Sequence, residues 1–114
     1  EAGLRNLQVI TADMNDFVAS GRFDRVVSVE MFEHMRNYER LLERIASWLQ
    51  DDGALFVHHF CHRRLAYPYE TAGAGNWMGR YFFTGGLMPS EDLLSRFPQQ
   101  LAVCQRWWWS GTHY

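Results

Sequence analysis

Two apolar segments separated by one amphipathic stretch constrain the fold of this chain more than any other feature. Phe23 to Val29 ("FDRVVSV") is apolar without alternation, which is typical of a parallel strand covered on both faces. Ala54 to Phe60 ("ALFVHHF") predicts another strand. Between them, a helix can begin at an Asn37 cap and run to about Gln50, where Asp51 to Gly53 ends it. Its apolar stripe comprises Leu41, Leu42, Ile45 and Leu49. This order predicts a right-handed crossover and an α/β sheet.

Three further elements are expected on either side of this unit. Leu7 to Ala12 ("LQVITA") is short, apolar and rich in β-branched residues, which predicts a buried strand. Ser90 can cap a short helix whose Leu93 and Leu94 face inward. Leu101 to Trp109 predicts a last strand, and its three consecutive tryptophans suit core and edge packing. We therefore expect one domain over residues 1–114.

Composition excludes several classes of function. The 114 residues are 47% hydrophobic with a net charge of −2, and the eleven basic residues are scattered arginines, so we expect no nucleic-acid interface. No apolar run approaches the length of a membrane helix and no signal peptide is evident. Cys61 and Cys104 form no CxxC pair, which favours a cytoplasmic setting. The glycines at Ala72 to Gly75 and in the turn at Gly85 and Gly86 do not match phosphate-binding loops.

Three titratable residues follow directly on the strand that ends at Val29. If a helical turn begins there, Glu30, Glu33 and His34 stand at i, i+3 and i+4 and share one face. Open α/β sheets bind ligands at this end of a parallel strand, and clustered titratable groups perturb each other's pKa values as acid–base catalysis requires. The alternative is a solvated helix start, where the macrodipole favours acidic residues. Spacing alone leaves both interpretations open.

A second cluster, "HHFCHRR", lies at the end of the next strand. Strand alternation sends His58 and His59 to opposite faces, so they cannot share a metal. His58, Cys61 and His62 could still reach a common zinc ion, but their spacing matches no common zinc motif, and we predict no metal site. A hydrogen-bonded core histidine is the plainer interpretation of His58.

Several sequence blocks together resemble one family of enzymes. "VVSVEMFEHMRNYERLLERIASWLQDDGALFVHHFCHR", "NWMGRYFFTGGLMPSEDLL" and "GTHY" occur in this order and extend the likeness from Leu7 to Tyr114. They resemble the S-adenosylmethionine-dependent methyltransferases that include cyclopropane-fatty-acid synthases and coclaurine-type N-methyltransferases. The resemblance implies a partial class I Rossmann-like methyltransferase fold with central strands three to six and flanking helices. The family's glycine-rich cofactor loop, strands one and two, and strand seven have no counterpart in these residues.

The resemblance implies S-adenosylmethionine as cofactor and assigns three residues to it. Asp13 would accept a hydrogen bond from the adenine amino group, and Met14 would flank the adenine ring. Val29 would lie against the methionine end of the cofactor. Because the glycine loop is absent here, we expect activity to belong to a longer enzyme or an assembly.

The same resemblance assigns residues to the substrate side. Glu33, His58 and Tyr114 fall on positions that bind bicarbonate, used as a base, in the cyclopropane synthases. Phe60 departs from that pattern, because a smaller aliphatic residue is usual there. Tyr81 is the expected aromatic wall of the substrate pocket.

Glu30 separates the two branches of the family. The cyclopropane synthases usually have a small residue at this position, whereas "EMFEHM" resembles the N-methyltransferases, in which Glu30, Glu33 and His34 would hold and deprotonate an amine. We therefore expect methyl transfer to a small-molecule amine, with C-methylation of unsaturated acyl chains as the alternative. A second alternative is a non-catalytic remnant of the fold, forming a homo-oligomer through exposed sheet edges.

Overall fold

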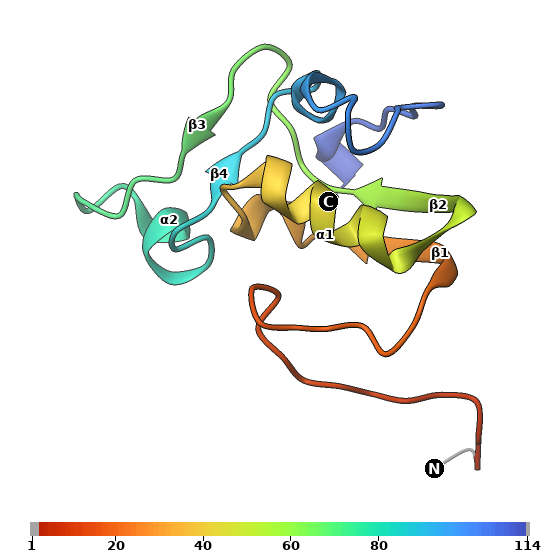
Figure 1. Cartoon of the computed structure of the whole chain (residues 1–114). Coiled ribbons are helices and arrows are strands. Elements are labelled where there is room, and N and C mark those ends of the chain that lie inside the picture. The colour runs from red at the N-terminus through yellow and green to blue at the C-terminus, as the bar shows by residue number, and fades with distance from the viewer. Residues whose placement is uncertain (1–2, 114) are drawn as a thin grey trace.

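A β–α–β unit forms the centre of the protein. In this computed structural model, residues 3–113 are described. Strand β1 (Phe23–Val29) leads through the short 3₁₀ helix η1 (Phe32–His34) into helix α1 (Tyr38–Trp48), and strand β2 (Leu49–His58) follows. Strands β1 and β2 pair in parallel, with Val29 opposite His58. The predicted crossover unit is confirmed (Figure 1).

Helix α1 covers one face of the β1–β2 pair. Its first turn is capped as predicted, because the Asn37 side chain accepts a hydrogen bond from the Arg40 amide at 3.0 Å. The helix ends at Trp48, two residues before the expected end. Its apolar stripe packs on partly buried Val26, Leu55 and Val57 of the sheet. The buried core comprises Phe32, Tyr38, Leu41, Leu42, Ile45 and Leu49.

Strand β2 begins earlier than the sequence indicated. Phe23 pairs with Leu49, but Arg25 pairs with Ala54, so Gln50–Gly53 bulge out of the ladder. This segment was predicted to lie between helix and strand. The bulge brings the Gly53 backbone close to Gln50, where a Cβ atom on residue 53 would lie 2.9 Å from the Gln50 carbonyl oxygen. Glycine at this position therefore allows β2 to resume its pairing with β1 at Ala54.

The second half of the chain is built from short elements. Strand β3 (Tyr67–Pro68) pairs antiparallel with β4 (Leu87–Met88), and helix α2 (Trp77–Tyr81) lies between them in sequence. The 3₁₀ helices η2 (Leu93–Arg96) and η3 (Gly111–His113) follow.

The predicted short helix is present as η2, although its cap differs. The Ser90 hydroxyl donates to Asp92 at 2.7 Å instead of capping the helix, and Asp92 occupies the cap position. Leu93 and Leu94 pack against the core as expected.

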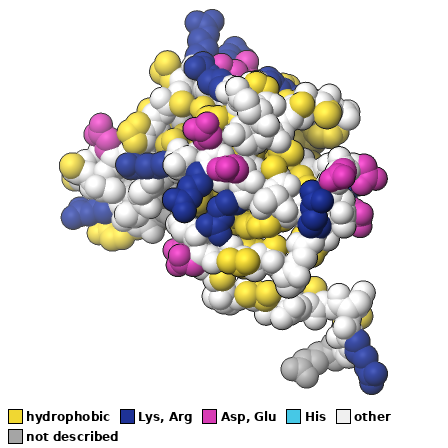
Figure 2. Space-filling view, viewed as in Figure 1, with side chains coloured by type: hydrophobic (Ala, Val, Ile, Leu, Met, Phe, Trp, Pro, Cys, Tyr) yellow, Lys and Arg dark blue, Asp and Glu magenta, His cyan; other side chains and the backbone are white. Residues whose placement is uncertain are grey.

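Two predicted strands are wrong. Residues 7–12 and 101–109 are irregular, and within residues 3–113 no backbone hydrogen bond joins either segment to a strand. Val9 is 84% exposed, and apolar side chains lie at the surface of the extended N-terminal segment (Figures 1 and 2). The sheet expected from strands three to six is therefore reduced to its central pair. A strand forms only where a neighbouring strand accepts and donates its backbone hydrogen bonds.

The face of the β1–β2 pair opposite α1 is strongly apolar and open. Val27 is 66% exposed, and Val29 and Phe56 are also exposed. The Phe56 ring has Trp107 beside it, with ring centroids 6.3 Å apart. Parallel sheets are normally covered on both faces, so this surface is suited to further packing.

No helix among residues 3–113 combines the length and the apolar character that crossing a membrane requires.

Candidate active site

The carboxyl ends of β1 and β2 bring Glu30 and His58 together. The Glu30 amide donates to the His58 carbonyl at 2.8 Å, and the Glu30 Oε1 atom lies 3.9 Å from His58 Nδ1. Glu30 adopts φ +50°, a left-handed conformation that favours glycine. A non-glycine residue there costs about 1 kcal/mol or more, and such strain concentrates at functional sites. His58 thus lies beside the Glu30 carboxylate at the end of the strand pair.

Glu33 is a carboxylate in the interior of the protein. It projects from η1 and is 0% exposed. Its Oε1 atom accepts a hydrogen bond from the Phe60 amide at 2.6 Å. Within residues 3–113, its Oε2 atom is buried and has no hydrogen-bond partner. Leaving a buried carboxylate oxygen without a hydrogen-bond partner is costly, so this atom calls for a functional explanation.

Neutral groups surround the Glu33 carboxylate. Burial, and next the Glu33 charge, raise the pKa of the Tyr38 phenol, whose hydroxyl donates to the Phe32 carbonyl at 2.7 Å. The same two causes, in the same order, raise the pKa of Tyr69 to about 12. Burial lowers the pKa of His59. Glu33 is therefore a carboxylate among groups that remain uncharged near neutral pH.

The raised pKa of Tyr69 predicts loss of stability at alkaline pH. The fold favours the neutral phenol, so this contribution is complete below the unfolded pKa of 10.0 and disappears as pH rises through about 12. Urea unfolding across this range should show a falling free energy of unfolding. Tyr69→Phe is expected to make that fall shallower, whereas Tyr81→Phe, at an exposed position, serves as the matched control. Equal slopes in both variants would contradict this prediction.

The expected shared face of Glu30, Glu33 and His34 is not formed. The 3₁₀ turn begins at Phe32, not directly after Val29, and Glu33 points inward while His34 is exposed. The His34 ring lies against Phe83, with centroids 5.2 Å apart. A solvated helix start is also wrong for Glu33, because the side chain is buried. The structure pairs Glu30 with His58 and Glu33 with the backbone of Phe60.

The residues predicted to hold the cofactor lie close to this region in different environments. Asp13 is exposed, and its Oδ1 atom accepts from the Asn15 backbone and side-chain amides at 2.7 and 2.9 Å. Met14 is partly buried against the core and lines a hollow together with His34. Val29 is exposed opposite His58 in the strand register. Their roles stay predictions.

Tyr81 and Tyr114 are the two other residues predicted to bind the substrate. Tyr81 is exposed on α2, where its ring lies 5.8 Å from that of Trp77 and the Arg80 guanidinium lies 5.8 Å above it. Tyr114 lies outside the described residues. Their assignment to the substrate pocket stays a prediction.

The zinc alternative is wrong for the part of the chain that the structure describes. No three side chains of His, Cys, Asp or Glu lie close enough there to hold a metal ion. His62 Nδ1 instead accepts hydrogen bonds from the Arg64 and Leu65 amides at 3.1 and 2.9 Å.

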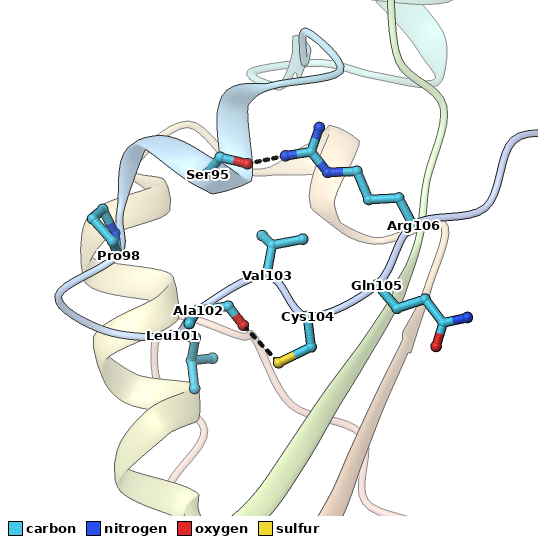
Figure 3. A pocket seen from close by; sticks show the side chains of 8 residues that line it. All are labelled: Ser95, Pro98, Leu101, Ala102, Val103, Cys104, Gln105 and Arg106. Carbon is cyan, nitrogen blue, oxygen red and sulfur yellow. Dashed lines mark hydrogen bonds between the residues drawn. The ribbon is translucent and has the colours of Figure 1, made fainter.

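A separate hollow of about 340 Å³ lies beneath the 101–106 segment (Figure 3). The Arg106 guanidinium donates to the Ser95 hydroxyl across it, and the Cys104 thiol donates to the Ala102 carbonyl at 3.6 Å. None of the predicted site residues lines this hollow.

Sequence analysis missed Tyr38, Tyr69 and Gly86 as neighbours of Glu33. Tyr38 and Tyr69 are close enough for the Glu33 charge to act on their phenols, and Gly86 lies against the Glu33 backbone. The only signal for Gly86 was its position in a Gly-Gly turn. Tyr69 and Gly86 are dozens of residues from Glu33 in the sequence, and proximity over such a separation leaves no periodic pattern. Tyr38 is only five residues from Glu33, but no motif marked it as a neighbour of the carboxylate.

The parallel β1–β2 pair joined through α1 defines an α/β protein, and Glu30 and His58 lie at the carboxyl ends of these strands, where open α/β sheets usually bind ligands. The chain belongs to the mycolic acid cyclopropane synthetase family, whose model matches residues 2–105. The predicted family resemblance is thereby confirmed.

Relatives from plants agree with this assignment. The (S)-coclaurine N-methyltransferase of Papaver somniferum is 42% identical over 100% of this chain and 33% of its own length. The enzyme of the same name from Thalictrum flavum subsp. glaucum is 40% identical over 97% of this chain and 31% of its own. The chain thus spans about a third of the length of the curated relatives it matches.

A solved structure gives the same result for the fold. The crystal structure of coclaurine N-methyltransferase bound to N-methylheliamine and SAH matches with a TM-score of 0.84 at 36% identity. The match covers 97% of this chain and 34% of that one. The chain therefore has part of a methyltransferase fold, as predicted.

Proposed function

We propose that this chain supplies the methyl-acceptor side of an S-adenosylmethionine-dependent N-methyltransferase acting on a small-molecule amine. The observation that carries the proposal is the buried Glu33 Oε2 atom without a partner, close to the ends of β1 and β2 where Glu30 meets His58. An amine N–H is a donor that could complete this site. The names of the plant relatives support an amine acceptor.

The proposed chemistry requires removal of a proton before methyl transfer. A protonated amine has no lone pair, so the protein must orient it and accept its proton. Glu33 Oε2 would accept a hydrogen bond from the protonated amine and then its proton. The Glu30 carboxylate, with its Oε1 atom 3.9 Å from His58 Nδ1, would hold the substrate cation. The cofactor, when bound, supplies an electrophilic methyl group.

The residues present fit one side of that cofactor. Asp13 offers an exposed carboxylate that can accept from an exocyclic amine, and Met14 and Val29 offer apolar contact surface. SAH in the related coclaurine N-methyltransferase structure supports the same choice.

The open apolar face of the sheet supports action within a larger unit. Val27, Val29 and Phe56 expose a surface that a parallel sheet normally covers. Such a surface suits packing against the remainder of a longer enzyme. A second copy of the chain is the other candidate, and homo-oligomerisation stays a prediction.

The proposal can be tested by grafting these residues into the related enzyme of Papaver somniferum in place of its matching third. The chimera is expected to methylate the parent enzyme's amine substrate in the presence of S-adenosylmethionine. A folded chimera that binds cofactor and substrate but transfers no methyl group would overturn the proposal.

Glu30→Gly in the chimera separates amine from acyl acceptors. Glycine relieves the strain at φ +50°, so the free energy of unfolding is expected to stay level or rise by up to about 1 kcal/mol. Amine methylation is expected to fall at least tenfold, because the carboxylate that orients the cation is lost. Chemical denaturation and initial rates provide the two measurements. Amine methylation at the parent rate would remove Glu30 from the proposed mechanism.

A further inference from the structure

The backbone behind Glu33 is in close contact with a turn from a distant part of the chain. A Cβ atom on Gly86 would overlap the carbonyl oxygen of Glu33. It would also lie 3.0 Å from the Glu33 carbonyl carbon and from the Cα atom of His34. Backbone atoms cannot move aside as a flexible side chain can, so only glycine permits this approach.

The turn that carries Gly86 is held firmly on its other side. The Gly86 amide donates to the Phe83 carbonyl at 2.9 Å, and its own carbonyl accepts from the Tyr69 amide at 3.2 Å. Phe83 and Tyr69 are stacked, with ring centroids 4.6 Å apart and planes 15° apart. Gly85 completes the turn at φ +81°. The turn therefore cannot retreat easily from a larger residue at position 86.

Glu33 is consequently held in place from two sides, by the Phe60 backbone and by the Gly86 turn. On one side its Oε1 atom accepts from the Phe60 amide at 2.6 Å, at the end of β2. On the other side its backbone rests on Gly86. A displacement of η1 by even a fraction of an ångström would lengthen the hydrogen bond between Glu33 Oε1 and the Phe60 amide. The reason is that neither the Phe60 backbone nor the Gly86 turn would move together with η1.

We propose that Gly86 is a positioning residue. By allowing the turn to contact the Glu33 backbone, it fixes the distance between η1 and this turn, and so orients the Glu33 carboxylate toward the amine acceptor. This inference rests on the proposed function for the role of the carboxylate. The dependence of the Glu33–Phe60 hydrogen bond on Gly86 does not rest on it. Gly86 touches neither substrate nor cofactor in this role. It acts only through the backbone of Glu33 and His34.

The test follows the Phe60 amide by ¹H–¹⁵N NMR at a fixed, near-neutral pH. A short hydrogen bond to the Glu33 side chain places the amide proton downfield and slows its exchange with solvent.

Gly86→Ala is expected to abolish the downfield position of the Phe60 amide proton. Hydrogen exchange of the Phe60 amide should become at least about tenfold faster, as expected for loss of a bond to a charged group. Resonances of the α1 core residues should persist. Gly75→Ala is the matched control, because a Cβ there meets nothing within 4 Å. An unchanged Phe60 amide in folded Gly86→Ala protein overturns the proposal.

Gly85→Ala decides the question if Gly86→Ala does not fold. Its methyl group would meet nothing within 4 Å, but φ +81° strains any side chain and shifts the turn. The Phe60 amide is then expected to lose part of its downfield shift, and an unaltered amide contradicts the proposal. These readouts need no methyl transfer, so failure of the proposed function leaves this test intact.

Discussion

Glu33→Gln in the chimeric enzyme is expected to lower kcat/KM for amine methylation by about 10²- to 10⁴-fold, the range associated with loss of a general base. Glutamine keeps the size of the side chain and an oxygen that can accept from the Phe60 amide. It removes the negative charge and the ability to accept a proton at the buried Oε2 position. The change therefore tests proton acceptance with little change in packing.

Controls for Glu33→Gln can be drawn from the same chain. Glu39→Gln removes one negative charge from the exposed first turn of α1 and should leave kcat/KM within about twofold, as expected for a surface site. A spectroscopic titration should also show a lower pKa for Tyr69 in Glu33→Gln, because the Glu33 charge contributes to raising it. Full activity together with a lowered Tyr69 pKa would show that Glu33 is buried as described but is not the base.

Phe32→Ala is expected to lower the free energy of unfolding by about 3–5 kcal/mol. The Phe32 side chain is completely buried, and its ring lies 5.6 Å from Tyr38 and 6.4 Å from His59, measured between ring centroids. Truncation leaves a cavity where η1, α1 and the end of β2 meet. Because small domains are stable by only about 5–15 kcal/mol, this single change removes a large part of the total.

Urea denaturation measures the effect of Phe32→Ala, with Phe82→Ala as the matched aromatic control. Phe82 is 59% exposed, and the centroid of its ring lies 4.9 Å from that of Phe83. Its loss should therefore cost less than about 1.5 kcal/mol. Equal effects of the two substitutions would place Phe32 outside the core.

The confirmed predictions depend on local patterns. The Asn37 cap, the apolar stripe of α1 and the two strands on either side of it follow from hydrogen bonding and periodicity within short windows. Leu7 to Ala12 has an equally good strand pattern, but no strand within residues 3–113 pairs with it, and it stays irregular. Backbone pairing is non-local, so residue propensity alone cannot decide it.

The candidate site shows the same division between local and tertiary causes. The sequence by itself determined that Glu30 and Glu33 follow a buried strand, and that His58 ends its neighbour, since both facts follow from residue order and strand patterning. Only the tertiary structure decided that Glu33 is buried, that His34 is exposed, and that Gly86 touches the backbone behind the carboxylate. The physical reason is that a side chain's direction and burial depend on backbone dihedral angles and on packing partners distant in sequence, which a periodic pattern does not encode.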